Sequence, residues 1–142
     1  MASSAGTRKA RVTDLTVREG EAPWTAAEVD AVRSELLAEV SRLTGEVAGA
    51  EEDLYRLVRD YGNGAGEDSA DSGSASFERE NEQVITNTVR EVLRQSQRAL
   101  RRIEDGTYGR CEGCGGAIGK MRLQAFPRAT LCLTCKQREE RH

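Results

Sequence analysis

CEGCGGAIGKMRLQAFPRATLCLTC, residues 111–135, contains all four cysteines of this 142-residue chain. They form two Cys-x-x-Cys pairs, Cys111 with Cys114 and Cys132 with Cys135. The 17 residues between the pairs fall within the spacing of about 15 to 20 that is typical of zinc sites. Four thiolates fill a tetrahedral coordination sphere and leave no position for water or substrate. The spacing therefore predicts one structural zinc ion bound by these four cysteines.

Two other interpretations of the cysteine pairs stay open. A redox Cys-x-x-Cys of the thioredoxin type belongs in a βαβ setting, which nothing in this sequence predicts. Two disulfides would suit a secreted domain, but residues 1–20 carry four basic side chains and no apolar signal segment. The single histidine, His142, is terminal, and it is not expected to be a ligand.

A long helix is predicted upstream of the cysteines, over residues 25–60. Thr25-Ala26-Ala27-Glu28 forms a capping box, and Trp24 and Val29 flank it as a hydrophobic staple. From Val40 onward, apolar residues recur at alternating steps of three and four, which is typical of a coiled-coil seam. The full predicted seam is Val29, Val32, Leu36, Val40, Leu43, Val47, Ala50, Leu54, Leu57 and Tyr61.

A second helix is predicted from Phe77 to Asp105, followed by Gly106 as a left-handed cap. Neither helix can bury its apolar stripe alone, so we expect an antiparallel coiled-coil hairpin over residues 24–106. Residues 61–76, rich in Gly, Ser, Ala and Asp, are predicted to be its tip loop. The predicted seam of the second helix is Ile85, Val89, Val92, Ser96, Ala99 and Ile103.

The two ends of the chain complete a mainly α fold. Residues 1–23 have no sustained period and are expected to be a flexible tail. Residues 107–142 are expected to form a four-cysteine zinc finger and a short basic C-terminal helix. The expected core around the metal is Ile118, Met121, Leu123, Phe126 and Leu131.

Charge is distributed unevenly along the chain. Residues 1–76 carry a net charge of −7 and residues 77–142 a net charge of +4. Because an acidic half would oppose lying along a duplex, this split favours a partner with both basic and acidic surfaces. Five arginines of the second helix either pair with acids of the first helix, such as Glu35, Glu39 and Glu46, or contact a partner. They are Arg90, Arg94, Arg98, Arg101 and Arg102.

The sequence argues against an enzyme and against a membrane protein. All cysteines are committed to the metal, and no internal histidine is available as a base. Neither a P-loop nor a Gly-x-Gly-x-x-Gly pattern is present. No run of 18 apolar residues exists, and a reduced metal site is expected in the cytoplasm.

Acids lie close together in the predicted tip. Glu67, Asp68 and Asp71 stand among small residues that cannot shield them, so they could approach a cation or a basic pocket. Alternatively, Asp68 and Asp71 could cap the second helix, because carboxylates accept hydrogen bonds from helix N–H groups.

Several motifs occur in order around these features. Asp68-x-x-Asp71 is followed by FERE at 77–80, RIEDGTYGRC at 102–111 and IGKMRLQAFP at 118–127. Over roughly residues 25–140, this succession resembles the DksA/TraR family of bacterial transcription regulators. The resemblance implies an RNA polymerase-binding factor that inserts its coiled-coil tip into the secondary channel of the enzyme and alters the lifetime of promoter complexes. It also implies that no defined DNA sequence is bound, and we expect a monomer.

The resemblance assigns roles to particular residues. Asp68 and Asp71 match the two aspartates of the family's D-x-x-D-x-A tip, and the four cysteines match its zinc ligands. The final alanine of that motif is Gly73 here, and a glycine lacks the methyl group and loosens the chain. The best-studied members act together with the alarmone ppGpp, but residues that bind it cannot be matched one by one in this sequence.

Two other functional classes remain as alternatives. A zinc-ribbon nucleic-acid-binding protein would use the basic C-terminal half to contact phosphates. A coiled-coil assembly protein would pair its helices between chains instead of within one.

Overall fold

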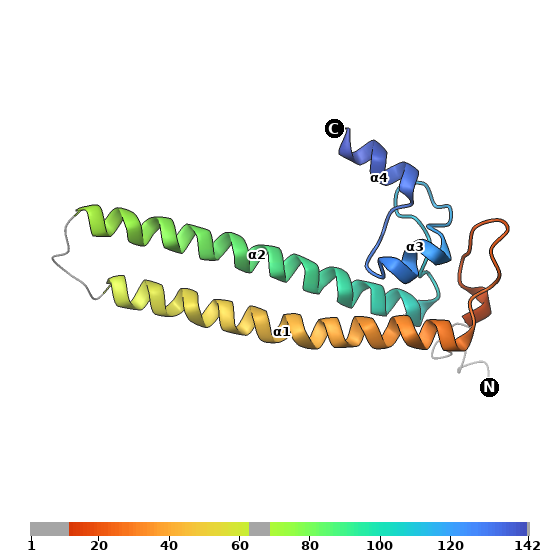
Figure 1. The fold of residues 1–142 in the computed structure, drawn as a ribbon, viewed down its shortest axis with the longest axis horizontal. Helices are drawn as coiled ribbons and strands as arrows, with labels where there is room; N and C mark the ends of the chain where they lie inside the picture. Colours follow the sequence, from red (N-terminus) through yellow and green to blue (C-terminus); the bar gives the residue numbers. More distant parts are fainter. Residues whose placement is uncertain (1–11, 63–68, 142) are drawn as a thin grey trace, which may run out of the picture. The chain divides into compact units, whose positions relative to one another are not determined.

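The computed structural model describes residues 12–62 and 69–141 (Figure 1). Within them, the chain is helical, and the only β-structure is a single bridge between Arg110 and Ala117. No helix in these two ranges is long and apolar enough to cross a membrane. The elements are a 3₁₀ helix, Val12–Asp14, and the helices α1, Ala26–Gly62; α2, Ser69–Asp105; α3, Lys120–Ala125; and α4, Leu133–Glu140.

The chain divides into two compact units. Among the described residues, one unit combines 12–38 with 95–141 and contains α3, α4 and the cysteines. The other unit, residues 39–94, contains the remaining parts of α1 and α2. The predicted mainly α fold is confirmed.

α1 begins with the predicted capping box. The backbone N–H of Thr25 donates to Glu28 Oε1 at 2.9 Å, and the N–H of Glu28 donates to Thr25 Oγ1 at 3.1 Å. Two N–H groups that the helix itself cannot satisfy are thereby paired. Trp24 and Val29 are each 1% exposed and belong to the same core, as a hydrophobic staple requires.

α1 and α2 pair in opposite directions. In the unit that holds the cysteines, Arg33 of α1 lies 3.7 Å from Glu104 of α2. In the other unit, Glu51 of α1 lies 2.6 Å from Arg90 of α2. Later residues of α1 therefore meet earlier residues of α2, and Figure 1 shows the two helices side by side. This arrangement confirms the predicted antiparallel hairpin.

The predicted seam of α1 is confirmed from Val29 to Leu57, whereas Tyr61 lies outside the part described for side chains, and the seam of α2 is partly wrong. The side chains of Ser96, Ala99 and Ile103 are buried as expected, but Ile85 is 45% exposed and its neighbour Thr86 is fully buried. Counting back from Val89, a step of four reaches Ile85 and a step of three reaches Thr86, so periodicity alone permits both. Burial of Thr86 is tolerated because its hydroxyl donates to the Glu82 carbonyl at 2.8 Å.

The predicted tip loop over residues 61–76 is too long. α1 continues to Gly62 and α2 begins at Ser69, eight residues before the predicted start at Phe77. The first turns of α2 contain small and polar residues without an apolar period. Once later turns have formed, a helix extends through such residues at little cost, because propagation needs no new nucleus.

The predicted flexible tail over residues 1–23 is wrong from Val12 onward. Leu15 is 4% exposed and belongs to the same core as Trp24, and Val12 and Val17 pack against it. Residues 1–11 lie outside the described residues. Apolar residues that are buried singly, outside a long helix or strand, show no periodicity. Their burial therefore cannot be predicted from a sequence pattern.

Candidate metal centre

The first cysteine pair lies on a tight turn. Cys111 N donates to the Gly116 carbonyl at 2.7 Å, and Gly115, at φ 78°, donates its N–H to the Cys111 carbonyl at 3.0 Å. The backbone N–H groups of Gly113 and Gly116 point at the sulfur atoms of Cys111 and Cys114, at 3.3 and 3.4 Å. This turn presents both sulfurs to one point and stabilises negative charge on them.

The second pair lies at the start of α4. Cys132 is the N-cap residue of this helix, and its sulfur accepts a hydrogen bond from Cys135 N at 3.4 Å. The N–H of Cys132 in turn donates to Cys111 Sγ at 3.3 Å and joins the two pairs. A helix N-terminus also favours the negative charge of a thiolate.

The four sulfur atoms form one compact cluster. They all lie within 4.8 Å of one another, and Cys114 Sγ is 3.9 Å from Cys132 Sγ. Four sulfurs bound tetrahedrally at 2.3 Å from zinc would be separated by about 3.8 Å. No disulfide joins the four cysteines, so the disulfide interpretation is wrong. The described elements around the cysteines are helices and do not form the βαβ unit in which a redox Cys-x-x-Cys pair is found.

Gly113 is required by this close packing. A Cβ atom added there would lie 3.0 Å from Cys135 Sγ and 3.2 Å from Cys135 Cβ. Because these neighbours are themselves held in the cluster, a larger residue at position 113 would push the two cysteine pairs apart.

Two of the sulfurs have strongly shifted pKa values. Burial would raise the pKa of Cys111, but N–H donors from Cys132, Cys114 and Gly113 outweigh it and lower the pKa to about 6. Hydrogen bonding to Cys132 and Cys111, together with burial, raises the pKa of Cys135 to about 12. Four thiolates at these distances therefore need a cation to neutralise them, and the set of donors suits Zn²⁺.

The predicted core of the zinc finger is only partly correct. Ile118 and Leu123 are buried and Leu131 is half-buried, but Met121 is 79% exposed and Phe126 is 61% exposed. With six residues, α3 has one inward face, which Leu123 occupies. The ring of Phe126 lies instead under the Arg122 guanidinium, 5.6 Å from its centroid.

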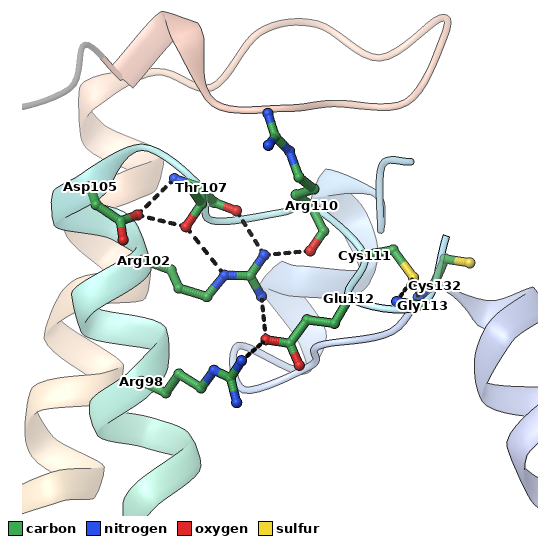
Figure 2. Close-up of polar contacts among 9 residues, drawn as sticks. All are labelled: Arg98, Arg102, Asp105, Thr107, Arg110, Cys111, Glu112, Gly113 and Cys132. Atoms are coloured by element: carbon green, nitrogen blue, oxygen red, sulfur yellow. Dashed lines mark hydrogen bonds and ion pairs between the residues drawn. The ribbon is translucent and has the colours of Figure 1, made fainter. Parts of the chain in front are cut away.

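Arg102, Glu112 and Thr107 surround the cysteine turn, and the sequence pattern did not identify them as part of the site (Figure 2). The Arg102 guanidinium donates to the Thr107 carbonyl at 2.9 Å and to the Arg110 carbonyl. Glu112 Oε2 forms an ion pair with Arg98 and lies 3.7 Å from the Arg102 guanidinium. The RIEDGTYGRC motif offered a signal for this contact, because an arginine nine positions before Cys111 is close enough in the chain to contact the turn of the first cysteine pair.

The arginines of α2 only partly have the expected partners on α1. Arg90 binds Glu51 of α1, and Arg94 binds Glu91 of its own helix at 2.6 Å. The anticipated partners Glu39 and Glu46 both bind Arg42 instead.

The structure does not test the predicted tip residues. Asp68 lies outside the described residues. The backbone of Asp71 falls within α2, but the surroundings of its side chain are likewise outside the description.

Comparison with known proteins identifies the fold and the metal site. A sequence profile for the prokaryotic dksA/traR C4-type zinc finger matches residues 106–141. The solved structure of transcription factor DksA2 from Pseudomonas aeruginosa shares 30% sequence identity, with a TM-score of 0.66, over 82% of this chain and 85% of that one. The chain belongs to the DksA/TraR family. Its four cysteines accordingly form a C4 zinc finger that holds a structural zinc ion.

Other relatives match shorter regions. The RNA polymerase-binding transcription factor DksA of Caulobacter vibrioides is 40% identical over 74 residues, which is 52% of each chain. General stress protein 16O of Bacillus subtilis is 34% identical over 89 residues, which covers 61% of this chain and 55% of that protein. The chain spans about half the length of these relatives.

Proposed function

We propose that this protein is a transcription regulator that binds RNA polymerase and acts without catalysing a reaction. The observation that carries the proposal is the similarity to DksA2, which extends over 82% of the chain and so includes the helical pair as well as the zinc finger. Relatives named as RNA polymerase-binding transcription factors support it.

In the proposed mechanism, the end of the hairpin enters the secondary channel of the polymerase. Helices of 37 residues extend about 55 Å at 1.5 Å per residue, which provides the reach. Asp68 and Asp71 then act electrostatically near the magnesium ions of the polymerase, because carboxylates attract or compete for such cations. The zinc finger stabilises the fold, and the protein acts as a cytoplasmic monomer without sequence-specific DNA binding.

The test combines a binding assay with a transcription assay. Purified protein is incubated with core RNA polymerase, and promoter-complex lifetime is measured for wild type, the Asp68→Asn/Asp71→Asn variant and Asp53→Asn. Asp53 is an exposed acid of α1 and serves as the matched control. We expect all three proteins to bind the polymerase and only the tip variant to lose regulation.

Other outcomes would favour the alternative classes. Duplex binding that weakens steeply with salt, without polymerase binding, would indicate a nucleic-acid-binding zinc ribbon. A dimer at low concentration in sedimentation experiments would indicate a coiled-coil assembly protein. Regulation by the tip variant equal to that by wild type would remove Asp68 and Asp71 from the mechanism.

A further inference from the structure

Arg102, in the last turn of α2, concentrates its contacts on the first cysteine pair. Its side chain is 12% exposed, and its guanidinium donates to the Thr107 carbonyl, the Thr107 hydroxyl at 3.4 Å and the Arg110 carbonyl. Figure 2 shows the guanidinium between these groups and the carboxylate of Glu112. A nearly buried arginine whose fork is occupied in this way is held in one orientation.

These contacts lie on both sides of a zinc ligand. Arg110 precedes Cys111 in the chain and Glu112 follows it. The Cys111 sulfur is also the acceptor for the N–H groups of Gly113 and Cys132, so its position influences both cysteine pairs. Arg102 thus fixes the backbone that orients a sulfur which accepts N–H groups from both cysteine pairs.

Glu112 extends the connection to the second cysteine pair. Its backbone N–H donates to the Thr130 carbonyl at 2.9 Å, two residues before Cys132. Its carboxylate is shared by Arg102 and Arg98, both on α2. One residue therefore joins α2, the turn of the first pair and the segment leading to the second.

Arg102 also contributes to the turn that ends α2. The N–H groups of Thr107 and Tyr108 donate to the Arg102 carbonyl at 3.0 and 3.1 Å, while Asp105 Oδ1 accepts from the Thr107 N–H and hydroxyl at 3.0 and 2.6 Å. The backbone and the side chain of Arg102 therefore hold the same turn from two directions.

We propose that Arg102 is a positioning residue of the zinc site, which holds the Cys111 turn in its metal-binding geometry and so sets the rate of zinc release. Glu112 is its partner in this role. Because coupling is reciprocal, zinc binding also stabilises the last turn of α2. This role is separate from polymerase binding and does not depend on it.

The first experiment measures zinc transfer from the full-length protein to a chromogenic chelator. Arg102→Lys keeps the charge but cannot reproduce the planar fork. We expect release to be about 10- to 100-fold faster, which corresponds to the loss of metal affinity found when residues supporting a metal ligand are replaced. Arg94→Lys is the control, since Arg94 pairs within its own helix, and it should release zinc at the wild-type rate. Release by Arg102→Lys within twofold of wild type would overturn the proposal.

Glu112→Gln separates positioning from a general loss of folding. It leaves the carbonyl contacts of Arg102 in place and should speed release by about tenfold, while circular dichroism in excess zinc matches wild type. The double variant should release zinc less rapidly than the product of the two single effects predicts, because both single variants lose the shared contact between Arg102 and Glu112. Multiplied effects in the double variant would show that the two residues act independently and would contradict the proposal.

Hydrogen exchange tests the reciprocal effect. Chelation of zinc from wild type should speed exchange at the amides of Thr107 and Tyr108 more than at amides of residues 39–94. In Arg102→Lys, exchange at these two amides should already be fast with zinc bound. Equal rates before and after chelation in wild type would exclude the coupling.

Discussion

Glu21 accepts a hydrogen bond of 3.0 Å from the backbone N–H of Lys120, a residue 99 positions away in the sequence. Its second oxygen accepts from the N–H of Met121 at 3.2 Å. The N-cap residue of α3, Gly119, has no side chain to make such bonds. The N-terminal segment therefore supplies the cap that α3 lacks.

Replacing Glu21 by Gln should destabilise the protein at pH 7. The loss should be about 1 kcal/mol, as for other helix caps, because a neutral amide is a weaker acceptor and does not favour the helix dipole. Thermal unfolding of the zinc-loaded protein measures the effect. Glu19→Gln, an exposed change in the same segment, should leave the midpoint unaltered, and an equal shift in both variants would rule out a specific cap.

The same carboxylate should make stability depend on pH. Burial would raise the pKa of Glu21, but the N–H groups of Lys120, Arg18 and Met121 outweigh burial and hold the pKa below its ordinary value of 4.5. Because the pKa is lower in the folded state, the ionised Glu21 carboxylate stabilises the fold fully above pH 4.5. This stabilisation is lost as the pH falls through the folded-state pKa. The difference in unfolding midpoint between wild type and Glu21→Gln should thus be constant near neutrality and shrink in acid. Acid release of zinc affects both proteins alike, so the difference isolates Glu21.

Ser96→Ala should stabilise the helical pair. Ser96 Oγ is fully buried and has no hydrogen-bond partner among the described residues. Removing an unsatisfied hydroxyl and introducing a better helix former should add about 1 kcal/mol to the free energy of unfolding. Thr86→Val is the comparison, because the Thr86 hydroxyl is already bonded and its removal brings no such gain. Destabilisation by Ser96→Ala in chemical denaturation would reveal a bound water at this hydroxyl.

Cys114→Ser should abolish stoichiometric zinc binding. Cys114 is exposed, so its replacement removes a ligand with little change in packing. We expect zinc content measured by elemental analysis to fall from one ion per chain, and residues 107–141 to lose protection from proteolysis, because metal binding contributes directly to folding. Thr134→Ala changes an exposed non-ligand within the second pair and should retain the ion. Full zinc content in Cys114→Ser would contradict the four-cysteine site.

Gly73→Ala tests the early start of α2. Position 73 falls inside the helix, where alanine is more favourable than glycine by about 1 kcal/mol. Helix content and the unfolding midpoint should rise, and under the proposed function regulation should strengthen. Gly45→Ala in α1, where an added Cβ meets nothing within 4 Å, should stabilise similarly without altering regulation. Unchanged stability in Gly73→Ala would argue against helix at this position.

Features encoded by local spacing could be predicted from the sequence. Thr25 and Glu28 are three residues apart, so their reciprocal bonds follow from helix geometry alone. The α1 seam and the cysteine spacing are likewise periodic, and both predictions are confirmed, the seam from Val29 to Leu57.

Features that depend on distant partners could not be predicted. The burial of Leu15 and the cap formed by Glu21 depend on residues about a hundred positions away. The partners of Arg102 are near in the sequence, but its role was overlooked because an arginine in a charged helical face has the same pattern whether it meets solvent or a carbonyl. At Ile85, the period itself was ambiguous, and packing of α2 selected Thr86.

Gly109 is closely covered by the N-terminal segment. A Cβ atom added there would lie 2.9 Å from the Thr16 carbonyl oxygen, and Gly109 has φ 95°. Nearby, Trp24 packs on Tyr108 with ring centroids 5.9 Å apart. The smallest piece able to fold around the metal is consequently discontinuous in the gene. A fragment that begins at residue 106 would lack the N-terminal segment that covers its apolar side and should not fold stably around zinc, whereas joining residues 12–38 to 95–141 through a short linker should yield a miniature protein that does.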